Sequence, residues 1–320
     1  MKVVFSDWMS VGGIPAAVFW PYFAGIALTI VALVRVARRE VPEAKGLDKV
    51  VVFGPLFLAV PMAVFGADHY MFWRSMGPMV PSWIPWHPFW ILFVGTALIA
   101  AAVSIVVRRY DSLAATLLGI MIFLFVVLIH VPNLIEIPGD RFLLAVALRD
   151  TSFSAGAFAY ALYRAQPSSK RGLLRLIRYV MGTVWIVFGV EHFLHPQNVP
   201  VVPLEKLLPP WIPGHLFLAA VTGTMLIACG VAVIFEEKAQ AAATWLGTYC
   251  VLVVLVVYLP MLIAKPDVDE GLNYLADTMV FCGCALVLAS ALSHRDGAAE
   301  VLPERAGAKP AVGLHQRGEA

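Results

Sequence analysis

The chain has 320 residues, of which 60% are apolar and only 14% are charged, and its mean hydropathy is +0.82. A soluble domain keeps about a quarter of its residues charged. This composition therefore excludes a soluble protein and predicts a polytopic membrane protein. The net charge of +2 does not indicate a nucleic-acid partner, because the basic residues cluster between apolar runs, where they orient membrane helices.

Nine apolar stretches, each of about 20 residues, are long enough to be membrane spans. Backbone groups inside a bilayer need partners within the chain, which favours helices, and the apolar run at 121–129 lacks the alternation of a membrane β-barrel. The predicted fold class is an all-α integral membrane protein with about nine transmembrane helices. The spans are expected near 14–34, 50–72, 88–107, 112–131, 142–163, 175–195, 215–235, 241–262 and 272–292.

Two long segments of the chain resemble each other, which indicates an internal duplication. The motif Phe65-Gly66-Ala67-Asp68-His69 returns as Phe188-Gly189-Val190-Glu191-His192, and Trp83-Ile84-Pro85 returns as Trp211-Ile212-Pro213. The spacing between matched residues stays between 123 and 128. Residues 47–166 and 172–292 are then two four-helix repeats, joined by a polar linker at 166–171. An even number of spans gives both repeats the same, parallel orientation.

The remaining segments flank the two repeats. Residues 1–46 supply one leading transmembrane helix and a cytoplasmic loop. Residues 293–320, rich in Gly, Ala, Pro and charge, are expected to form a disordered cytoplasmic tail. Most of the 23 basic residues follow spans one, three, five and seven or lie in this tail. The positive-inside rule thus predicts an inner-membrane protein with its N-terminus outside and its C-terminus in the cytoplasm.

Ionisable residues inside the predicted spans are the main candidates for a functional site, because such a group is costly in a membrane unless it is paired. The topology places six candidate catalytic residues near the outer leaflet: Asp68, His69, Asp150, Glu191, His192 and Asp277. Since the first and fourth helices of a bundle can be neighbours, Asp68 or His69 is expected to meet Asp150. In the same way, Glu191 or His192 is expected to meet Asp277.

Two interpretations of these residues stay open. A carboxylate beside an imidazole suits proton transfer coupled to a quinone-like ligand. Arg149, which has no counterpart in the second repeat, would instead neutralise a carboxylate. A hydrogen-bonded clamp between helices, with a structural role alone, would retain the same residues.

Four further residues are candidates for cofactor binding: His130, His195, Trp83 and Trp211. His195 shares a helix face with His192, but the first repeat has Phe72 at the matching position, and the second repeat has Tyr258 where the first has His130. These differences indicate that one repeat carries the active site and that the other is a degenerate copy. No metal site is predicted. The two tryptophans are expected to be interfacial anchors, with a lid over a substrate as the alternative.

The last helix of each repeat resembles that of the DoxX-like family of small four-helix membrane proteins. The run at 275–286, with Asp277 and Gly283, fits the family pattern well, and Asp150 with Gly156 fits it less completely. The resemblance covers about residues 47–292, although family members usually have one such unit. It implies a tandem of two DoxX-like bundles. Because relatives include a membrane subunit of thiosulfate:quinone oxidoreductase, it also implies a role near quinone on the outer face.

Three functions are compatible with these observations. The leading one is a redox- or quinone-linked accessory component of the membrane, with quinone as the candidate cofactor and a membrane redox protein as the candidate partner. The second is a small-molecule transporter that uses the interface between the repeats. Its weakness is that the inner halves of the spans contain almost no polar side chains. The third is a structural subunit of a membrane assembly.

Overall fold

The computed structural model describes residues 10–165, 171–236 and 238–306. Within these ranges, nine helices are long and apolar enough to cross a membrane, which confirms the predicted all-α membrane fold. Each lies within a few residues of its predicted span. They are Ala16–Arg39, Asp48–Met71, His87–Val107, Asp111–Glu136, Arg141–Ala165, Arg171–Leu194, His215–Ile234, Ala239–Ala264 and Val268–Ser293.

The chain begins with a short β-hairpin, which was not predicted, and a leading helix. These are β1 (Ser10–Val11), β2 (Ile14–Pro15) and α1 (Ala16–Arg39). The first half, built around residues 47–166, contains α2 (Asp48–Val51), α3 (Gly54–Met71), α4 (Trp73–Met76), η1 (Gly77–Met79), α5 (His87–Val107), α6 (Asp111–Phe125), η2 (Val126–His130), α7 (Val131–Glu136) and α8 (Arg141–Ala165).

The second half, built around residues 172–292, repeats this order of long helices. It contains α9 (Arg171–Leu194), α10 (His215–Ile234), α11 (Ala239–Val253), η4 (Val254–Tyr258), α12 (Leu259–Ala264), η5 (Val268–Leu272) and α13 (Asn273–Ala306). In both halves the third span is broken by a π-helical turn, η2 or η4.

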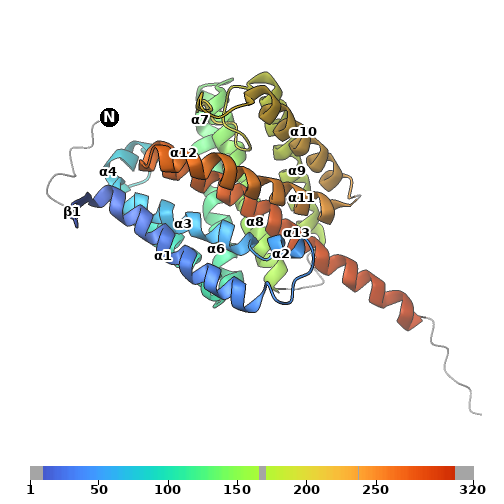
Figure 1. Ribbon diagram of the computed structural model, residues 1–320. Helices are drawn as coiled ribbons and strands as arrows, with labels where there is room; N and C mark the ends of the chain where they lie inside the picture. Colours follow the sequence, from blue (N-terminus) through green and yellow to red (C-terminus); the bar gives the residue numbers. More distant parts are fainter. Residues whose placement is uncertain (1–9, 166–170, 237, 307–320) are drawn as a thin grey trace, which may run out of the picture.

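The last helices of the two halves, α8 and α13, pack against each other in the middle of the bundle (Figure 1). The first helix of each half packs on the last helix of the other half: α3 lies along α13, and α9 lies along α8. Within each half the second helix packs on the first and the third packs on the fourth. The span in α13 is mostly buried by protein, whereas α1 packs on the outside of α3 and is largely exposed.

The first two spans of each half cross at a pair of glycines. A Cβ atom on Gly66 would lie 2.8 Å from the Gly95 carbonyl oxygen, and a Cβ atom on Gly189 would lie 2.8 Å from that of Gly223. Any larger residue at these positions would push the helices apart, so glycine is what lets them approach closely. The same close contact therefore occurs in both halves.

A proline explains the π-helical turn in the third span of each half. Pro132 follows η2 and Pro260 follows η4, each as the second residue of the next helix. Proline has no N–H, and its ring collides with the carbonyl four residues earlier, so the preceding turn widens into a π-helical one. His130 ends the first turn and Tyr258 ends the second, which places them at matching positions 128 residues apart.

The last helix, α13, continues to Ala306, past residue 293 where the predicted tail begins. Alanine, glutamate, leucine and arginine are good helix formers, and a helix that already exists is extended at little cost. Residues 307–320 lie outside the described residues, as does most of the linker predicted at 166–171. Cys229, Cys250, Cys282 and Cys284 are buried and free.

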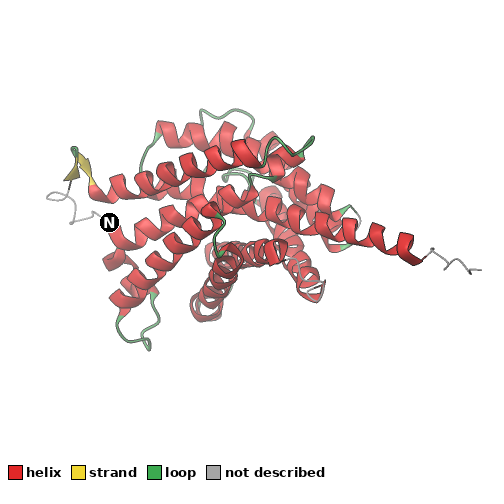
Figure 2. Cartoon of the chain, turned by 90° about the horizontal axis from the view of Figure 1, so that it is seen from below, coloured by secondary structure: helices red, strands yellow, loops and turns green. Residues whose placement is uncertain are grey.

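Consecutive spans run in opposite directions, so their connections gather at two ends of the bundle. The loop face is the end that carries residues 72–86, 137–140, 195–214 and 265–267. The basic face is the opposite end, which carries residues 40–47, 108–110 and 235–238. The β-hairpin and the C-terminal end of α13 lie at opposite ends of the molecule (Figure 2).

Candidate functional site at the loop face

Four ionisable side chains form a connected chain where α8 and α13 meet. His130 Nε2 lies 2.8 Å from Asp150 Oδ2, and Arg149 Nε donates to Asp150 Oδ1 at 2.9 Å. Arg149 Nη1 donates to Asp277 Oδ2, also at 2.9 Å. The guanidinium of Arg149 therefore bridges one carboxylate from each half, and His130 closes one end of the chain.

This geometry differs from the pairing expected from the sequence. The prediction that Asp68 or His69 meets Asp150 is wrong, since the partners of Asp150 are His130 and Arg149. The reason is that the first helix of each half packs on the last helix of the other half. The helix α3 therefore lies along α13 and makes few contacts with α8.

The corresponding prediction for the second half, that Glu191 or His192 meets Asp277, is wrong for the same reason, because α9 packs along α8 and the partner of Asp277 is Arg149. The suggestion that Arg149 neutralises a carboxylate is confirmed, and it contacts two of them.

The chain of four side chains is largely shielded from solvent. The exposed fractions are 15% for His130, 12% for Asp150, 20% for Arg149 and 10% for Asp277. Shielded charges interact more strongly than those in water. Removing one partner of such a group leaves an uncompensated charge, which is strongly destabilising. The arrangement can thus act as a joint between the halves.

A second ion pair joins the halves beside this chain. Arg141 Nε, at the start of α8, donates to Glu191 Oε2 at 2.5 Å, and His195 Nε2 lies 3.8 Å from the same oxygen. The sequence places Glu191 and His195 one helical turn apart, and the structure brings their side chains together. The His195 side chain is 37% exposed, so it lies at the edge of the protein surface.

Residues 197–208, here called the cap segment, fold into the loop face. Backbone hydrogen bonds of 2.9 Å close the segment at its base, from Leu208 N to Gln197 O and from Val199 N to Lys206 O. Apart from the exposed Leu207, its valine and leucine side chains are almost completely covered, with exposed fractions of 0% for Val199, 1% for Val201, 2% for Val202, 4% for Leu204 and 4% for Leu208. The cap segment is thus part of the protein interior and does not lie as an open loop on the surface.

His192 holds the middle of the cap segment. Its Nδ1 lies 2.6 Å from the Phe188 carbonyl oxygen, and because a carbonyl only accepts, Nδ1 carries the ring proton. Nε2 is then the acceptor for the Val201 N–H at 2.9 Å. Protonation of Nε2 would set two donors against each other. His192 therefore acts as a neutral positioning group for the cap segment, and its ring nitrogens are both occupied.

The backbone of the cap segment is strained at the point that His192 holds. Val201 has a φ of +76°, which is unfavourable for a β-branched residue. Tyr258 Oη donates to the neighbouring Pro200 carbonyl at 2.6 Å, and Arg141 Nη2 donates to the Pro203 carbonyl at 2.8 Å. These side-chain bonds satisfy carbonyl oxygens that no regular helix or sheet would satisfy.

Lys206 fastens the far end of the cap segment to the start of the last span. Its Nζ lies 4.7 Å from the centre of the Tyr274 ring and 2.5 Å from the Glu270 carbonyl oxygen. Burial lowers the pKa of Lys206, although the carboxylates of Glu270 and Asp267 work in the opposite direction. The lysine remains a cation over an aromatic ring, which is a favourable arrangement.

The loop at the same position in the first half, residues 77–86, lies on the outside of the bundle. Met79 is 64% exposed, Trp83 69% and Trp86 78%. Trp211, in the second half, is 54% exposed. Both Trp83 and Trp211 thus have the exposure expected of interfacial anchors. His69 donates from Nδ1 to the Phe65 carbonyl at 2.7 Å, as His192 does in the second half.

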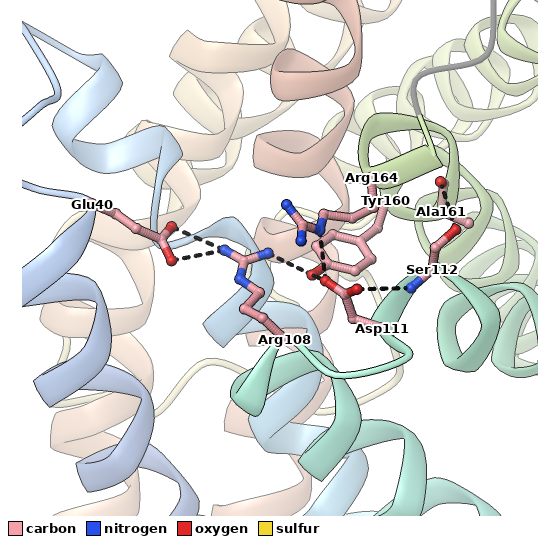
Figure 3. A network of polar contacts seen from close by, with 7 residues as sticks. All are labelled: Glu40, Arg108, Asp111, Ser112, Tyr160, Ala161 and Arg164. Carbon is pink, nitrogen blue, oxygen red and sulfur yellow. Dashed lines mark hydrogen bonds and ion pairs between the residues drawn. The ribbon is translucent and has the colours of Figure 1, made fainter.

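A second polar network lies at the basic face, where residues at the ends of α1 and α5 are joined to α6 and α8 (Figure 3). Arg108 Nη2 donates to both carboxylate oxygens of Glu40 at 2.9 Å, and Nη1 donates to Tyr160 Oη at 2.5 Å. Tyr160 Oη in turn donates to Asp111 Oδ2 at 2.8 Å, and Arg164 Nε donates to the same oxygen at 2.6 Å. Every charge in the network has a partner of opposite sign, which indicates a structural role.

The electrostatics of Arg108 support that conclusion. Burial disfavours its charged form, but the oxygen of Tyr160 and the carboxylate of Glu40 outweigh burial, and the pKa of Arg108 lies above its usual value. The guanidinium is thus a fixed cation that ties the leading helix to the first half of the bundle.

Sequence reasoning missed Arg141 and the cap segment. The signal for the cap segment is present in the chain, because Val199, Val201, Val202 and Leu204 form a run of apolar residues in a connection that would otherwise lie in water. Arg141 gives no such signal, since a basic residue at the start of a span is commonly an interfacial anchor.

Within the described ranges, no group of three or more His, Cys, Asp and Glu side chains is arranged to hold a metal ion. Comparison of the chain with family models, curated proteins and solved structures gave no match in any of the three. The function must therefore be argued from the geometry of the site itself.

Proposed function

We propose that this protein is a redox-linked membrane component in which His130 and Asp150 exchange protons with a quinone-like ligand. Reduction of a quinone needs two electrons and two protons, so a membrane redox partner would supply the electrons. The observation that carries the proposal is the 2.8 Å contact between His130 Nε2 and Asp150 Oδ2. A carboxylate on one ring nitrogen orients the imidazole for proton exchange through the other.

The difference between the halves supports a working site in the first half only. The position of His130 is taken by Tyr258 in the second half, and this tyrosine is 1% exposed. Its hydroxyl is bonded to Pro200 of the cap segment. Tyrosine is also a much weaker acid than the imidazolium ion. The second half is thus a copy whose ligand position is closed by the chain itself.

The proposal includes the ancestry and placement of the chain. The matched glycine crossings and the matched π-helical turns support an internal duplication of a four-helix unit resembling the DoxX-like family. The concentration of lysine and arginine at the basic face supports an inner-membrane protein with that face in the cytoplasm. The loop face, and with it His130, would then lie on the outer side.

The experiment is quinone analysis of the purified full-length chain. Protein extracted in a mild detergent should release quinone into organic solvent, and His130→Phe should lower the bound amount at least tenfold. His195→Phe is the matched control. His195 is 37% exposed, and its Nε2 atom lies 3.8 Å from Glu191 Oε2, which is a weak contact. The proposal fails if the wild-type chain contains no quinone and does not bind an added short-chain analogue.

A structural role for the same residues is the second candidate, and the bridging of Asp150 and Asp277 by Arg149 favours it. The two candidates make different predictions for His130→Phe. A structural clamp predicts a lower unfolding midpoint with no change in bound quinone, whereas a ligand site predicts loss of quinone from a protein that unfolds at nearly the same temperature.

A further inference from the structure

Asp68 is a buried carboxyl group that lacks the ion pairs found at Asp150, Asp277 and Glu191. Its exposed fraction is 3%, and its Oδ1 atom is buried without a hydrogen-bond partner. Among the described residues, none of the lysines, arginines or histidines forms an ion pair with it. By contrast, Asp150 and Asp277 share Arg149, and Glu191 is paired with Arg141.

The neighbours of Asp68 act on a negative charge there in opposite directions. The side chain of Asn273 lies beside the carboxyl group and favours the charge, whereas the carboxylate of Asp269 repels it. Asn273 Oδ1 is also buried without a donor. Asp68 and Asn273 therefore each hold a buried oxygen atom that lacks a hydrogen-bond donor. A proton on the Asp68 carboxyl group would supply such a donor.

In the part of the chain that the structure describes, the other elements packed on α3 offer no compensating charge. Residues 88–107 of α5 contain no acidic or basic side chain. From α1, the hydroxyl of Tyr22 is itself buried without a partner and lies near Asp267. His69, the next residue on α3, uses Nδ1 to donate to the carbonyl oxygen of Phe65. Arg74 of α4 is exposed and lies over the Trp73 ring.

Comparison with the second half shows how this environment arises. Asp68 and Glu191 occupy the same place in the repeated motif, and Glu191 is paired with Arg141. The charged neighbour of Asp68 is the carboxylate of Asp269, which repels it. The charge beside the acid is therefore positive at Glu191 and negative at Asp68.

We propose that Asp68 is a proton-binding site at the loop face, separate from the His130–Asp150 pair, and that it carries a proton in the folded protein at neutral pH. An isolated carboxylate in a dry environment is so unfavourable that the group takes up a proton and becomes neutral. The step is the addition of one proton from water to the carboxylate to form the carboxylic acid, with no change in oxidation state.

The test is infrared spectroscopy of the full-length protein in lipid vesicles at neutral pH. The wild-type chain should show the C=O stretch of a protonated carboxylic acid, which shifts in deuterium oxide, and Asp68→Asn should abolish it. Glu191→Gln is the matched control and should leave the band unchanged, because Glu191 is an ionised partner of Arg141. A wild-type protein without the band, or a band that persists in Asp68→Asn, would overturn the proposal.

A second variant keeps the proposal testable if Asp68→Asn fails to fold. Asp269 is exposed, so Asp269→Arg should be tolerated, and it would give Asp68 the partner that Glu191 already has. The acid band should then disappear although Asp68 is still present. The alternative occupant is a sodium ion. If replacing sodium by choline lowers the unfolding midpoint of the wild-type chain but not of Asp68→Asn, the site binds a metal cation and the proposal is wrong.

Discussion

The two halves of the molecule place matching residues at the loop face in opposite environments. In the second half, the cap segment covers His192 and Tyr258, and the acid Glu191 is paired with Arg141. In the first half, residues 77–86 stay outside the bundle, and the acid Asp68 is unpaired. In each half, the loop that follows the first helix decides whether the loop-face ends of the helices are covered. Loops commonly differ in this way on scaffolds that are otherwise alike.

What the halves share lies deeper in the bundle. The Gly66–Gly95 crossing matches the Gly189–Gly223 crossing, and each third span has a π-helical turn before a proline. These features decide how closely helices approach and where they widen, so they are independent of the loops. A comparison of variants in the two halves therefore separates the common scaffold from the local differences.

The largest effect is expected from the residue that joins the halves. Arg149→Met leaves Asp150 and Asp277 buried without a cation, and it should lower the free energy of unfolding by about 3–5 kcal/mol. Chemical unfolding in detergent micelles measures this. Arg149→Lys should cost less, although a single ammonium cannot bond both carboxylates in the forked geometry. If Arg149→Met were as stable as the wild-type protein, Arg149 would not be the residue that holds the two halves together.

The glycine crossings should respond equally in the two halves. Gly66→Ala and Gly189→Ala each place a Cβ atom 2.6 Å from an isoleucine side chain, and each should cost about 1–3 kcal/mol. Gly172→Ala is the control, since nothing lies within 4 Å of its Cβ position, and it should be neutral or slightly stabilising. If Gly66→Ala and Gly189→Ala lowered the free energy of unfolding by different amounts, the two helix crossings would differ in strength despite their matching contacts.

The histidines should respond unequally. His192→Phe removes the acceptor for the buried Val201 N–H, which should cost about 2 kcal/mol and expose the cap segment. Hydrogen exchange at residues 198–208 should then speed up by roughly tenfold or more, since about 1.4 kcal/mol is a factor of ten. The same change at His69 should leave exchange at residues 77–86 unaltered. Equal behaviour of both variants would contradict the distinction between a closed and an open half.

The smallest effect is expected from a single hydroxyl group. Tyr258→Phe removes the hydrogen bond to the Pro200 carbonyl and should cost about 1 kcal/mol, measured as a small fall in the unfolding midpoint. The exchange of cap-segment amides should rise less than in His192→Phe. A larger effect than that of His192→Phe would mean that Tyr258, and not His192, is the main support of the cap segment.

Much of the fold follows from the sequence, because each span is an apolar run of the length that a bilayer requires. The nine spans found in the described residues are of this kind. The packing order does not follow in the same way. Nothing in the apolar pattern of α3 distinguishes a partner in α8 from one in α13, since both present small and apolar residues.

The candidate site likewise has residues that the sequence identifies and residues whose role depends on the packing. His130 and Asp150 are identifiable because ionisable groups are rare in spans, and the asymmetry with Tyr258 is visible in the sequence. The role of His192 is not, because it depends on a carbonyl one turn away and on an N–H of the cap segment. A histidine in a membrane span has the same sequence signature whether it positions a loop or exchanges protons.

The exchange of first helices between the halves has a consequence for biogenesis. The surface of α3 that carries Asp68 is covered by α13, which leaves the ribosome after the eight other described spans. More than 200 residues separate Asp68 from Asn273, and such distant contacts form slowly. The early span thus waits with a polar group facing lipid until α13 has been synthesised. A chain truncated before α13 should consequently be retained by membrane quality control, even though it keeps eight of the nine spans found in the described residues.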